Sequence, residues 1–204
     1  MQGMAGEFRY VLCSHKLTAP TCQAFTMLKR KKRLAEAGRR KMQQIDGQDL
    51  WRKLGPAYFR ELSTFGAIQD AVLLNMLLSC RVLQLNSGEV LYSLGDRTGF
   101  FYIVLQGSIN NFIPGQDGTM VLSRHHEPGD DLGFVHMISL SDRTATAIAE
   151  EDAVILEISI EQFFMLHEQE PDAFGLILLN LARGMARTIL RMADKLVELD
   201  KNCT

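Results

Sequence analysis

The best candidate for binding chemistry is a single arginine that follows a glycine-containing turn. Arg143 is the only Lys or Arg between Arg124 and Arg183, and Thr144 follows it directly. Ten residues earlier, Gly133 allows a ligand to approach the backbone closely. A guanidinium binds phosphate oxygens through two parallel hydrogen bonds, which the ammonium of a lysine cannot copy. These residues therefore predict a site for a phosphate-bearing anion.

The segment 132–136 is expected to complete this site as a short helix whose first N–H groups face the anion. The hydroxyl of Thr144 would add a further donor. The alternative for Arg143 is a structural salt bridge with one of three nearby acids: Asp130, Asp131 or Asp142. The sequence offers no paired carboxylates and no nucleophile with a local base, so no catalytic residue is assigned and the chain is not expected to be an enzyme.

The elements that must position this site are short strands. Between residues 81 and 158, apolar residues recur with a period of two, and turn residues such as Asn86-Ser87-Gly88 and Asp117-Gly118 separate them. Short strands with a turn every 8–12 residues are typical of an all-β sandwich or barrel. We therefore expect a mainly β fold with flanking helices, a β-sandwich or jelly-roll barrel over residues 81–158.

Helical periods flank the strands. Residues 48–79 repeat apolar side chains at three- and four-residue spacing, with an interruption at Gly55-Pro56. Residues 160–167 predict a short helix, and Pro171 begins a long one. In the long helix two sets of residues recur every seven positions: Leu178, Met185, Met192 and Leu199, and Ala182, Ile189, Leu196 and Cys203. This heptad pattern predicts a homodimer seam over residues 171–203; the alternative is a helix packed on its own sandwich.

Charge divides the chain in two. Residues 1–60 hold 13 basic and 4 acidic side chains, whereas residues 61–204 hold 9 and 20, which gives net charges of +9 and −11. We therefore predict a basic N-terminal extension, partly disordered or helical, over residues 1–47, and a domain over residues 48–204. The arm 29–41 could contact an anionic partner, although such charge runs usually mark solvated segments.

Three passages resemble the cyclic nucleotide-binding domain family. Residues 85–96 (LNSGEVLYSLGD) are similar to its strand–turn–strand motif, and residues 101–109 (FYIVLQGSI) to the strand that follows. Residues 128–134 (PGDDLGF) with residues 143–146 (RTAT) resemble its phosphate-binding cassette. Single glycines would only permit tight turns, but three motifs in the same order are specific. The resemblance covers residues of about 60–200.

The resemblance implies a regulatory sensor that binds cAMP or cGMP and transmits the signal through the long helix. It assigns ligand contacts to the cassette and to one residue of the long helix: Leu132, Gly133, Phe134, Val135, Arg143, Thr144, Ala145 and Met192. It implies a protein effector of unknown identity. It implies neither a firmly bound cofactor nor a metal. The transcription-factor branch of the family continues into a helix-turn-helix domain that this sequence lacks, so DNA binding by that route is not expected.

Two positions depart from the family pattern. The family carries Glu directly after the cassette glycine, where its carboxylate accepts hydrogen bonds from the ribose, and Phe134 stands there instead. An unsatisfied buried hydroxyl costs about 1–3 kcal/mol. Met192 and Ala193 take the place of the Thr and Ser that reach the purine in the catabolite-activator branch. These departures favour weak binding, another ligand, or a ligand-free dimerisation scaffold as the alternative function.

A metal enzyme of the cupin type is the third hypothesis, suggested by His125-His126. Adjacent histidines on a strand point to opposite faces, so both cannot easily bind one metal ion. No run approaches the ~18 apolar residues of a membrane span, so no transmembrane segment is expected. The first 25 residues lack a secretory pattern. The scattered Cys13, Cys22, Cys80 and Cys203 fit a reducing environment, so we expect a cytoplasmic protein.

Overall fold

The computed structural model describes residues 42–202, with side chains to residue 198. These residues belong to one of two units of the chain, Arg39–Thr204; the other is Met1–Gly38. The basic arm 29–41 lies outside the described residues. So do most of the predicted extension, three of the cysteines and the start of the chain.

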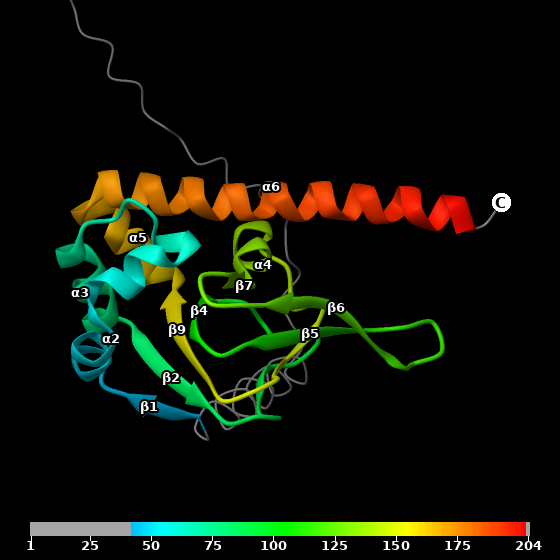
Figure 1. Cartoon of the computed structure of the whole chain (residues 1–204), viewed down its shortest axis with the longest axis horizontal. Coiled ribbons are helices and arrows are strands. Elements are labelled where there is room, and N and C mark those ends of the chain that lie inside the picture. The colour runs from blue at the N-terminus through cyan, green and yellow to red at the C-terminus, as the bar shows by residue number, and fades with distance from the viewer. Residues whose placement is uncertain (1–41, 203–204) are drawn as a thin grey trace, which may run out of the picture. The chain divides into compact units, whose positions relative to one another are not determined.

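Two antiparallel sheets form the centre of the domain (Figure 1). The first sheet has the order β1 (Gln43–Ile45), β2 (Arg81–Leu85), β9 (Ala153–Ser159), β4 (Phe100–Gln106) and β7 (Asp131–Leu132). The second has the order β3 (Val90–Tyr92), β8 (Thr146–Ala149), β5 (Ile109–Pro114) and β6 (Met120–His126). The predicted β-sandwich or jelly roll with flanking helices is confirmed.

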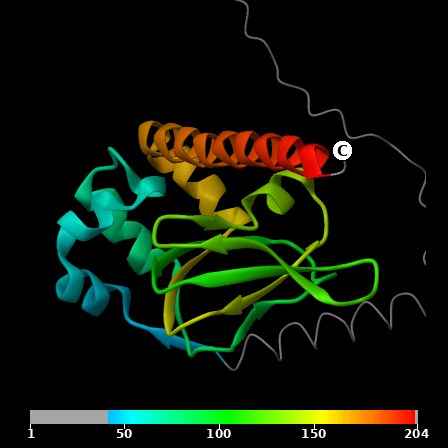
Figure 2. The same cartoon turned by 45° about the vertical axis from the view of Figure 1, so that its right-hand side comes forward.

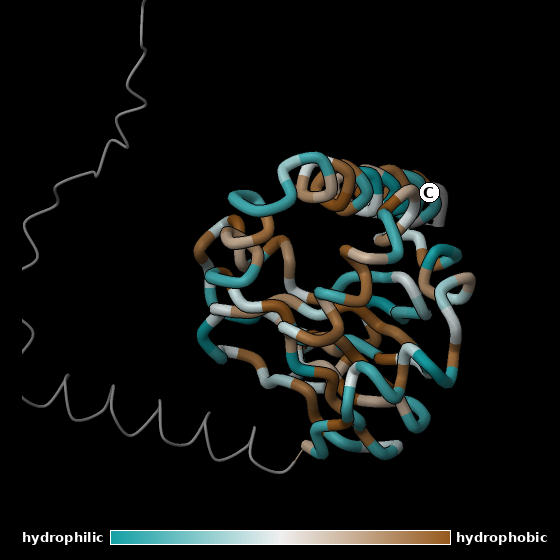
Figure 3. Tube along the Cα trace, turned by 90° about the vertical axis from the view of Figure 1, so that its left-hand side faces the viewer, coloured by the Kyte–Doolittle hydropathy of each residue, from teal (hydrophilic) through white to brown (hydrophobic). Residues whose placement is uncertain are grey.

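The five-stranded sheet separates two hydrophobic clusters, because successive side chains of a strand point to opposite faces. Tyr102 and Val104 of β4 face the second sheet and join the roll-interior cluster. Phe101 and Ile103 of the same strand face the helices and join the helix-side cluster. Figure 3 shows hydrophobic stretches along the strands in the middle of the domain. One strand therefore contributes to two separate cores.

Helices cover the outer face of the five-stranded sheet. They are α2 (Gly47–Glu61), the 3₁₀ turn η1 (Ser63–Phe65), α3 (Asp70–Ser79), α5 (Ile160–Gln169) and α6 (Pro171–Asn202), while α4 (Phe134–Ser139) follows β7. Asp46 caps α2 by accepting from two backbone N–H groups. The predicted interruption appears as a kink at Gly55, whose φ is 77°. Residues 43–47, which the sequence places in the extension, supply β1 and the start of α2.

The long helix α6 is anchored by its first half. Ala173, Ile177 and Leu181 are buried in the helix-side cluster, and the Asn180 amide donates to the carbonyls of Thr64 and Gly66. Residues 191–198 are all exposed. Figures 1 and 2 show the second half running beyond the helices that hold the first half. The first half of the helix, as far as Met185, thus packs against the core.

One sequence expectation needs correction. Residues Pro171–Glu198 form a helix that is long and apolar enough to cross a membrane, as judged by length and composition only, so the expectation that no segment reaches this limit is wrong. The core helix of a soluble protein passes the same test. This helix contains Arg183 and Arg187, and three of its apolar residues pack in the domain core. This finding alone is weak evidence for a membrane span.

We predict that Leu181→Ala lowers the free energy of unfolding by about 2–4 kcal/mol, because it leaves a cavity in a packed core. The matched control is Leu190→Ala on the same helix, where the side chain is 66% exposed rather than 1%. That change should cost less than about 0.5 kcal/mol. Urea unfolding of the three proteins measures both. Equal losses would contradict the anchoring of α6 by its first half.

Candidate functional site

The cassette is a turn, a short helix and a loop that connect β6 to β8. Gly133 is in the left-handed conformation, with φ 78°, and ends β7 where α4 begins at Phe134. After α4, Arg143 is tied to the loop between β3 and β4. Its N–H donates to the Asp96 carbonyl at 2.9 Å, and its carbonyl accepts from Gly95 N–H at 2.8 Å. Two loops therefore fix the backbone from which Arg143 projects.

The Arg143 side chain is buried, with 3% of the residue exposed. Its Nη1 donates to the Gly133 carbonyl at 3.0 Å and its Nη2 to the Phe100 carbonyl at 2.6 Å. The guanidinium lies 4.4 Å from the ring centre of Tyr92 and 5.6 Å from that of Tyr102. A cation over an aromatic ring is attracted by the negative face of the ring. Carbonyl oxygens and tyrosine rings thus surround this cation.

No carboxylate of the described residues lies within 4.0 Å of the Arg143 guanidinium, so the salt-bridge alternative is not realised. Asp130 pairs instead with Arg124, at 3.6 Å. Burying a charge without an opposite charge is costly, and the partial charges of carbonyls and rings compensate it only in part. The interior of the roll therefore holds a cation that an anion would stabilise.

Phe134 lies on the other face of the sheet from this cation. It is fully buried, and its ring centre is 5.3 Å from Phe101 and 5.9 Å from Phe163. A ring of this size is stabilised by burial, and the helix side offers an aromatic cluster to receive it. The family carboxylate is therefore missing, but Phe134 does not fill the interior of the roll.

The interior of the roll is occupied by residues that sequence reasoning missed. Tyr92 stacks on Tyr102 with ring centres 6.0 Å apart. The Tyr92 hydroxyl donates to Asn111 Oδ1 at 3.0 Å, and Asn111 Nδ2 lies 3.1 Å from His126 Nε2. Tyr92 belongs to the second half of the strand–turn–strand motif, which was the one sequence signal for it. The strand pairing that brings these residues together was not predictable from spacing.

Burial is the main cause of the pKa shifts of His126 and Asp131. It lowers the pKa of His126 to about 3, with the nearby Arg124 acting in the same direction, so the imidazole is neutral. Burial likewise raises the pKa of Asp131 to about 6, although Arg124 opposes the shift. Asp131 points toward α6, where its Oδ1 lies beside Gly184. At neutral pH the Asp131 carboxyl is therefore still mostly ionised, whereas His126 is neutral.

The remaining candidate residues are divided between the interior and the surface. Leu132 lies in the roll-interior cluster and Ala145 is buried. Val135 is exposed, and Met192 on α6 is 59% exposed. The Thr144 hydroxyl is also at the surface, 2.8 Å from His136 Nε2. The structure thus gathers Leu132, Gly133, Arg143 and Ala145, and leaves the others outside.

Two further sequence expectations concern the cassette helix and the histidine pair. Helix α4 begins at Phe134 and has six residues, so the expected helix over 132–136 is displaced: Leu132 is strand and Gly133 is the cap. His125 is exposed and His126 buried, as alternation along β6 requires. Among residues 42–202, no three His, Cys, Asp or Glu side chains form a group that could hold a metal ion.

The chain is similar to known proteins in both sequence and fold. The profile of the family described as "Cyclic nucleotide-binding domain" matches residues 82–170, which include the cassette. A cyclic nucleotide-binding domain from Methylobacillus flagellatus KT has a TM-score of 0.66 at 15% identity, over 77% of this chain and 88% of that one. The catabolite activator protein of Thermus thermophilus gives 0.58 at 24% identity, over 68% and 63%. At these identities the likeness shows the fold alone.

Two curated relatives are much longer proteins. Lysophospholipase NTE1 of Cryptococcus neoformans is 34% identical over 89 residues, which cover 44% of this chain and 5% of that protein. Neuropathy target esterase sws of Drosophila ananassae is 25% identical over 169 residues, which cover 78% and 11%. The chain thus spans between 5% and 11% of the length of these relatives.

We predict that Gly133→Ala destabilises the domain more than Gly88→Ala. Both glycines have a positive φ, 78° and 83°, so either alanine costs about 1–2 kcal/mol in backbone strain. A Cβ at Gly88 meets open space, whereas one at Gly133 would overlap the Arg143 guanidinium. Displacing that group should cost about 1–3 kcal/mol more. Urea unfolding compares the two variants, and equal losses would mean that the guanidinium is not held in place.

Proposed function

We propose that this chain, whose residues 82–170 match the profile of the cyclic nucleotide-binding domain family, is a non-enzymatic regulatory module. The resemblance identified from the sequence is confirmed for those residues, and the fold suggests a regulatory ligand-binding module. We propose further that its ligand is a cyclic nucleotide or a related phosphate-bearing anion, and that Arg143 is the residue that binds the phosphate.

The observation that carries this proposal is the buried Arg143 without a carboxylate partner. A phosphate oxygen close to the guanidinium would provide the missing opposite charge. The guanidinium has five N–H donors and uses one on the Gly133 carbonyl and one on the Phe100 carbonyl, so donors remain for a phosphate. Binding is favoured because a charged acceptor forms a hydrogen bond roughly twice as strong as a neutral one.

The side chain at position 134 supports a ligand held mainly by its phosphate. Without a carboxylate acceptor, a buried ribose hydroxyl would remain unsatisfied at a cost of about 1–3 kcal/mol, which is about 5- to 150-fold in affinity. A structural neighbour from Trypanosoma cruzi is described as bound to guanosine, and one from Xanthomonas campestris as responsive to c-di-GMP. Both ligands therefore belong in a test beside cAMP and cGMP.

The second candidate function is a ligand-free scaffold. Two tyrosine rings and two carbonyls already surround the Arg143 guanidinium, and Tyr92 and Tyr102 fill the roll beside it. In this form the cation would serve packing alone. The two candidates differ in a single measurable property, which is the response of the folded protein to added ligand.

We predict that one of cAMP, cGMP or c-di-GMP binds and raises the melting temperature by several degrees at a hundredfold excess over its dissociation constant. Titration calorimetry gives the affinity. Arg143→Lys keeps the charge but loses the two-pronged geometry, so it should weaken binding at least about tenfold. The control is Arg97→Lys, an exposed arginine in the loop before β4.

Titrations with inorganic phosphate and with uncharged guanosine distinguish binding through the phosphate from binding through the nucleoside. If only phosphate-bearing ligands bind, the role of Arg143 as the phosphate-binding residue is supported. If guanosine binds equally well, that role is contradicted. No heat and no thermal shift with any ligand would leave the scaffold function as the explanation.

We propose that two copies of the chain pair along α6. The heptad positions of its second half, Ile189, Met192 and Leu196, are each more than half exposed. Large apolar side chains on a helix with no protein neighbour are typical of an interface. A dimer would bury them and would bring the two cassettes under one shared helix pair.

We predict that Ile189→Glu and Leu196→Glu each convert a dimer to a monomer, because a carboxylate in an apolar seam must lose its hydration. The control is Leu190→Glu, which lies off the heptad stripe and is equally exposed. Sedimentation velocity at several concentrations gives the mass. A wild-type chain that remains monomeric at high micromolar concentration would contradict the seam.

A further inference from the structure

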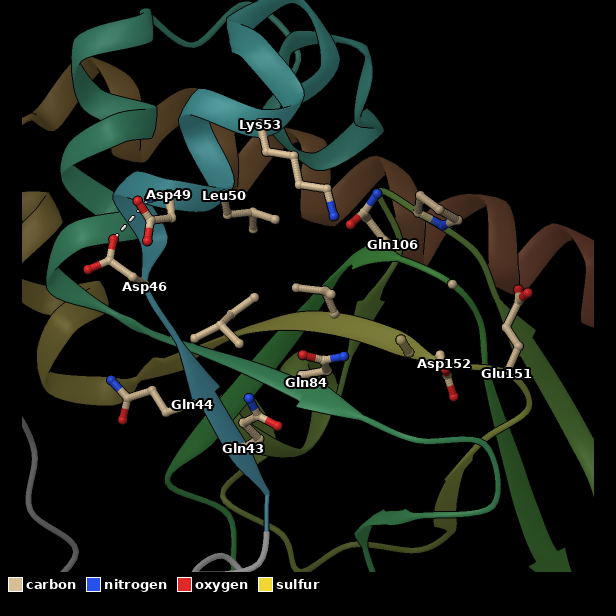
Figure 4. Close-up of a pocket in the computed structure, with 15 residues that line it drawn as sticks. Gln43, Gln44, Asp46, Asp49, Leu50, Lys53, Gln84, Gln106, Glu151 and Asp152 are labelled. Atoms are coloured by element: carbon tan, nitrogen blue, oxygen red, sulfur yellow. Dashed lines mark hydrogen bonds between the residues drawn. The ribbon is translucent and has the colours of Figure 1, made fainter.

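A groove lies on the helix side of the five-stranded sheet, away from the predicted ligand-binding residues of the cassette (Figure 4). Strand β1, the start of α2 and the turns that follow β4 and precede β9 enclose it, and its volume is about 770 Å³. A second cavity of about 450 Å³ shares Gly107, Pro128 and Glu151 with it. The two cavities are therefore neighbours on the surface.

A row of side chains crosses the floor of this groove. Gln43 is paired with Gln84, Gln84 with Val154, and Val154 with Gln106. Directly paired residues share a face of the sheet, so the three glutamines line one face of four adjacent strands. At about 4.8 Å per strand, the row is about 14 Å long, the span of about four extended residues.

The polar groups along this row have no partners within the protein. Among the described residues, the side chains of Gln43, Gln84 and Gln106 make no hydrogen bond, and neither does Lys53, which reaches down from α2 toward Gln106 (Figure 4). Gln84 and Gln106 are half-buried. A carboxamide offers one acceptor and two donors. These groups are therefore free to bind a ligand that carries both kinds of hydrogen-bonding group.

Carboxylates give the groove its charge. Six line the two cavities, against one lysine: Asp46, Asp49, Glu127, Glu150, Glu151 and Asp152. Asp49 is paired with Arg52 at 2.7 Å, and Glu150 and Glu127 lie 3.0 and 3.9 Å from the ring nitrogens of His125. Three are fixed by bonds to the domain, since Asp46 caps α2, Asp152 accepts from Ser87 N–H at 3.0 Å and Glu151 accepts from the Ser108 hydroxyl at 3.0 Å. In each of these three carboxylates, one oxygen accepts a hydrogen bond from the domain and the other oxygen remains for a ligand. Such preorganised acceptors favour a cationic ligand and disfavour an anion.

We propose that this groove binds an extended peptide segment of a partner protein that carries Lys or Arg side chains. The glutamine row matches the alternating N–H and C=O groups of a peptide backbone, and the fixed carboxylates match the basic side chains. Ile45, Leu50 and Val154 supply apolar surface between the polar groups. The site takes a ligand of opposite charge to that of the cassette, so it is independent of the function proposed above.

The test uses the full chain and three fluorescein-labelled nine-residue peptides with a shared Gly/Val frame. The remaining four positions carry Arg in one peptide, Glu in the second and Ser in the third. Fluorescence anisotropy at low ionic strength is expected to show saturable binding of the Arg peptide, weaker binding of the Ser peptide and none of the Glu peptide. The affinity should fall as salt is added, because the contacts are partly ionic.

Two pairs of variants locate the binding. Gln84→Met keeps the length of the side chain but removes its hydrogen bonds, and it should weaken the Arg peptide about tenfold. Asp49→Asn removes one charge and should weaken it about threefold. The controls are Gln69→Met and Glu168→Gln, both exposed and outside the groove, which should change nothing.

Three results would overturn the proposal. One is no saturable binding of any peptide, and another is Arg-peptide binding that Gln84→Met leaves unchanged. The third is spermine competing as well as the unlabelled Arg peptide, which would indicate a site for a small polycation. Since the cassette is untouched in these variants, a failure here does not bear on nucleotide binding.

Discussion

The roll is built around a buried guanidinium. Arg143 donates to the carbonyls of Gly133, at the start of α4, and Phe100, at the start of β4. Its position under the Tyr92 ring requires that β3 and β4 lie close together, and its backbone joins the loop between them. A buried charge at this position restricts which groups can lie beside it, because each neighbouring group must either solvate the cation or leave room for an anion.

The five-stranded sheet places different chemistry on its two faces. Its inner face meets the second sheet and carries the tyrosines around the cation. Its outer face holds the helices over most of its length and the glutamine row at the end that they leave uncovered. The two surfaces have opposite charge preferences, although β4 and β9 contribute to both. A rigid sheet can thus keep two ligands of different charge on separate sides without a second domain.

Much of the fold was predictable because local signals agree with it. The period of two, the glycine turns and the heptad helix each identify an element, and the spacing from Gly133 to Arg143 indicates the cassette. Three features depend on tertiary structure and were missed. Gln43–Ile45 is too short and too polar to be recognised as a strand without its partner β2. The face to which Phe134 turns depends on the aromatic cluster contributed by Phe163. The Tyr92–Asn111–His126 row joins three strands that no sequence spacing relates.

The anchoring of α6 at one end makes it a lever. At 1.5 Å per residue, the 32 residues of the helix extend for about 48 Å, of which about 31 Å lies beyond Leu181. A tilt of about 5° at the buried end would therefore move the far end by about 3 Å. A shift of about 3 Å is about half of the distance of about 5–6 Å between the Cβ atoms of neighbouring side chains on a helix. The length of the helix would therefore turn a small change of packing at its buried end into a larger change of position at its tip.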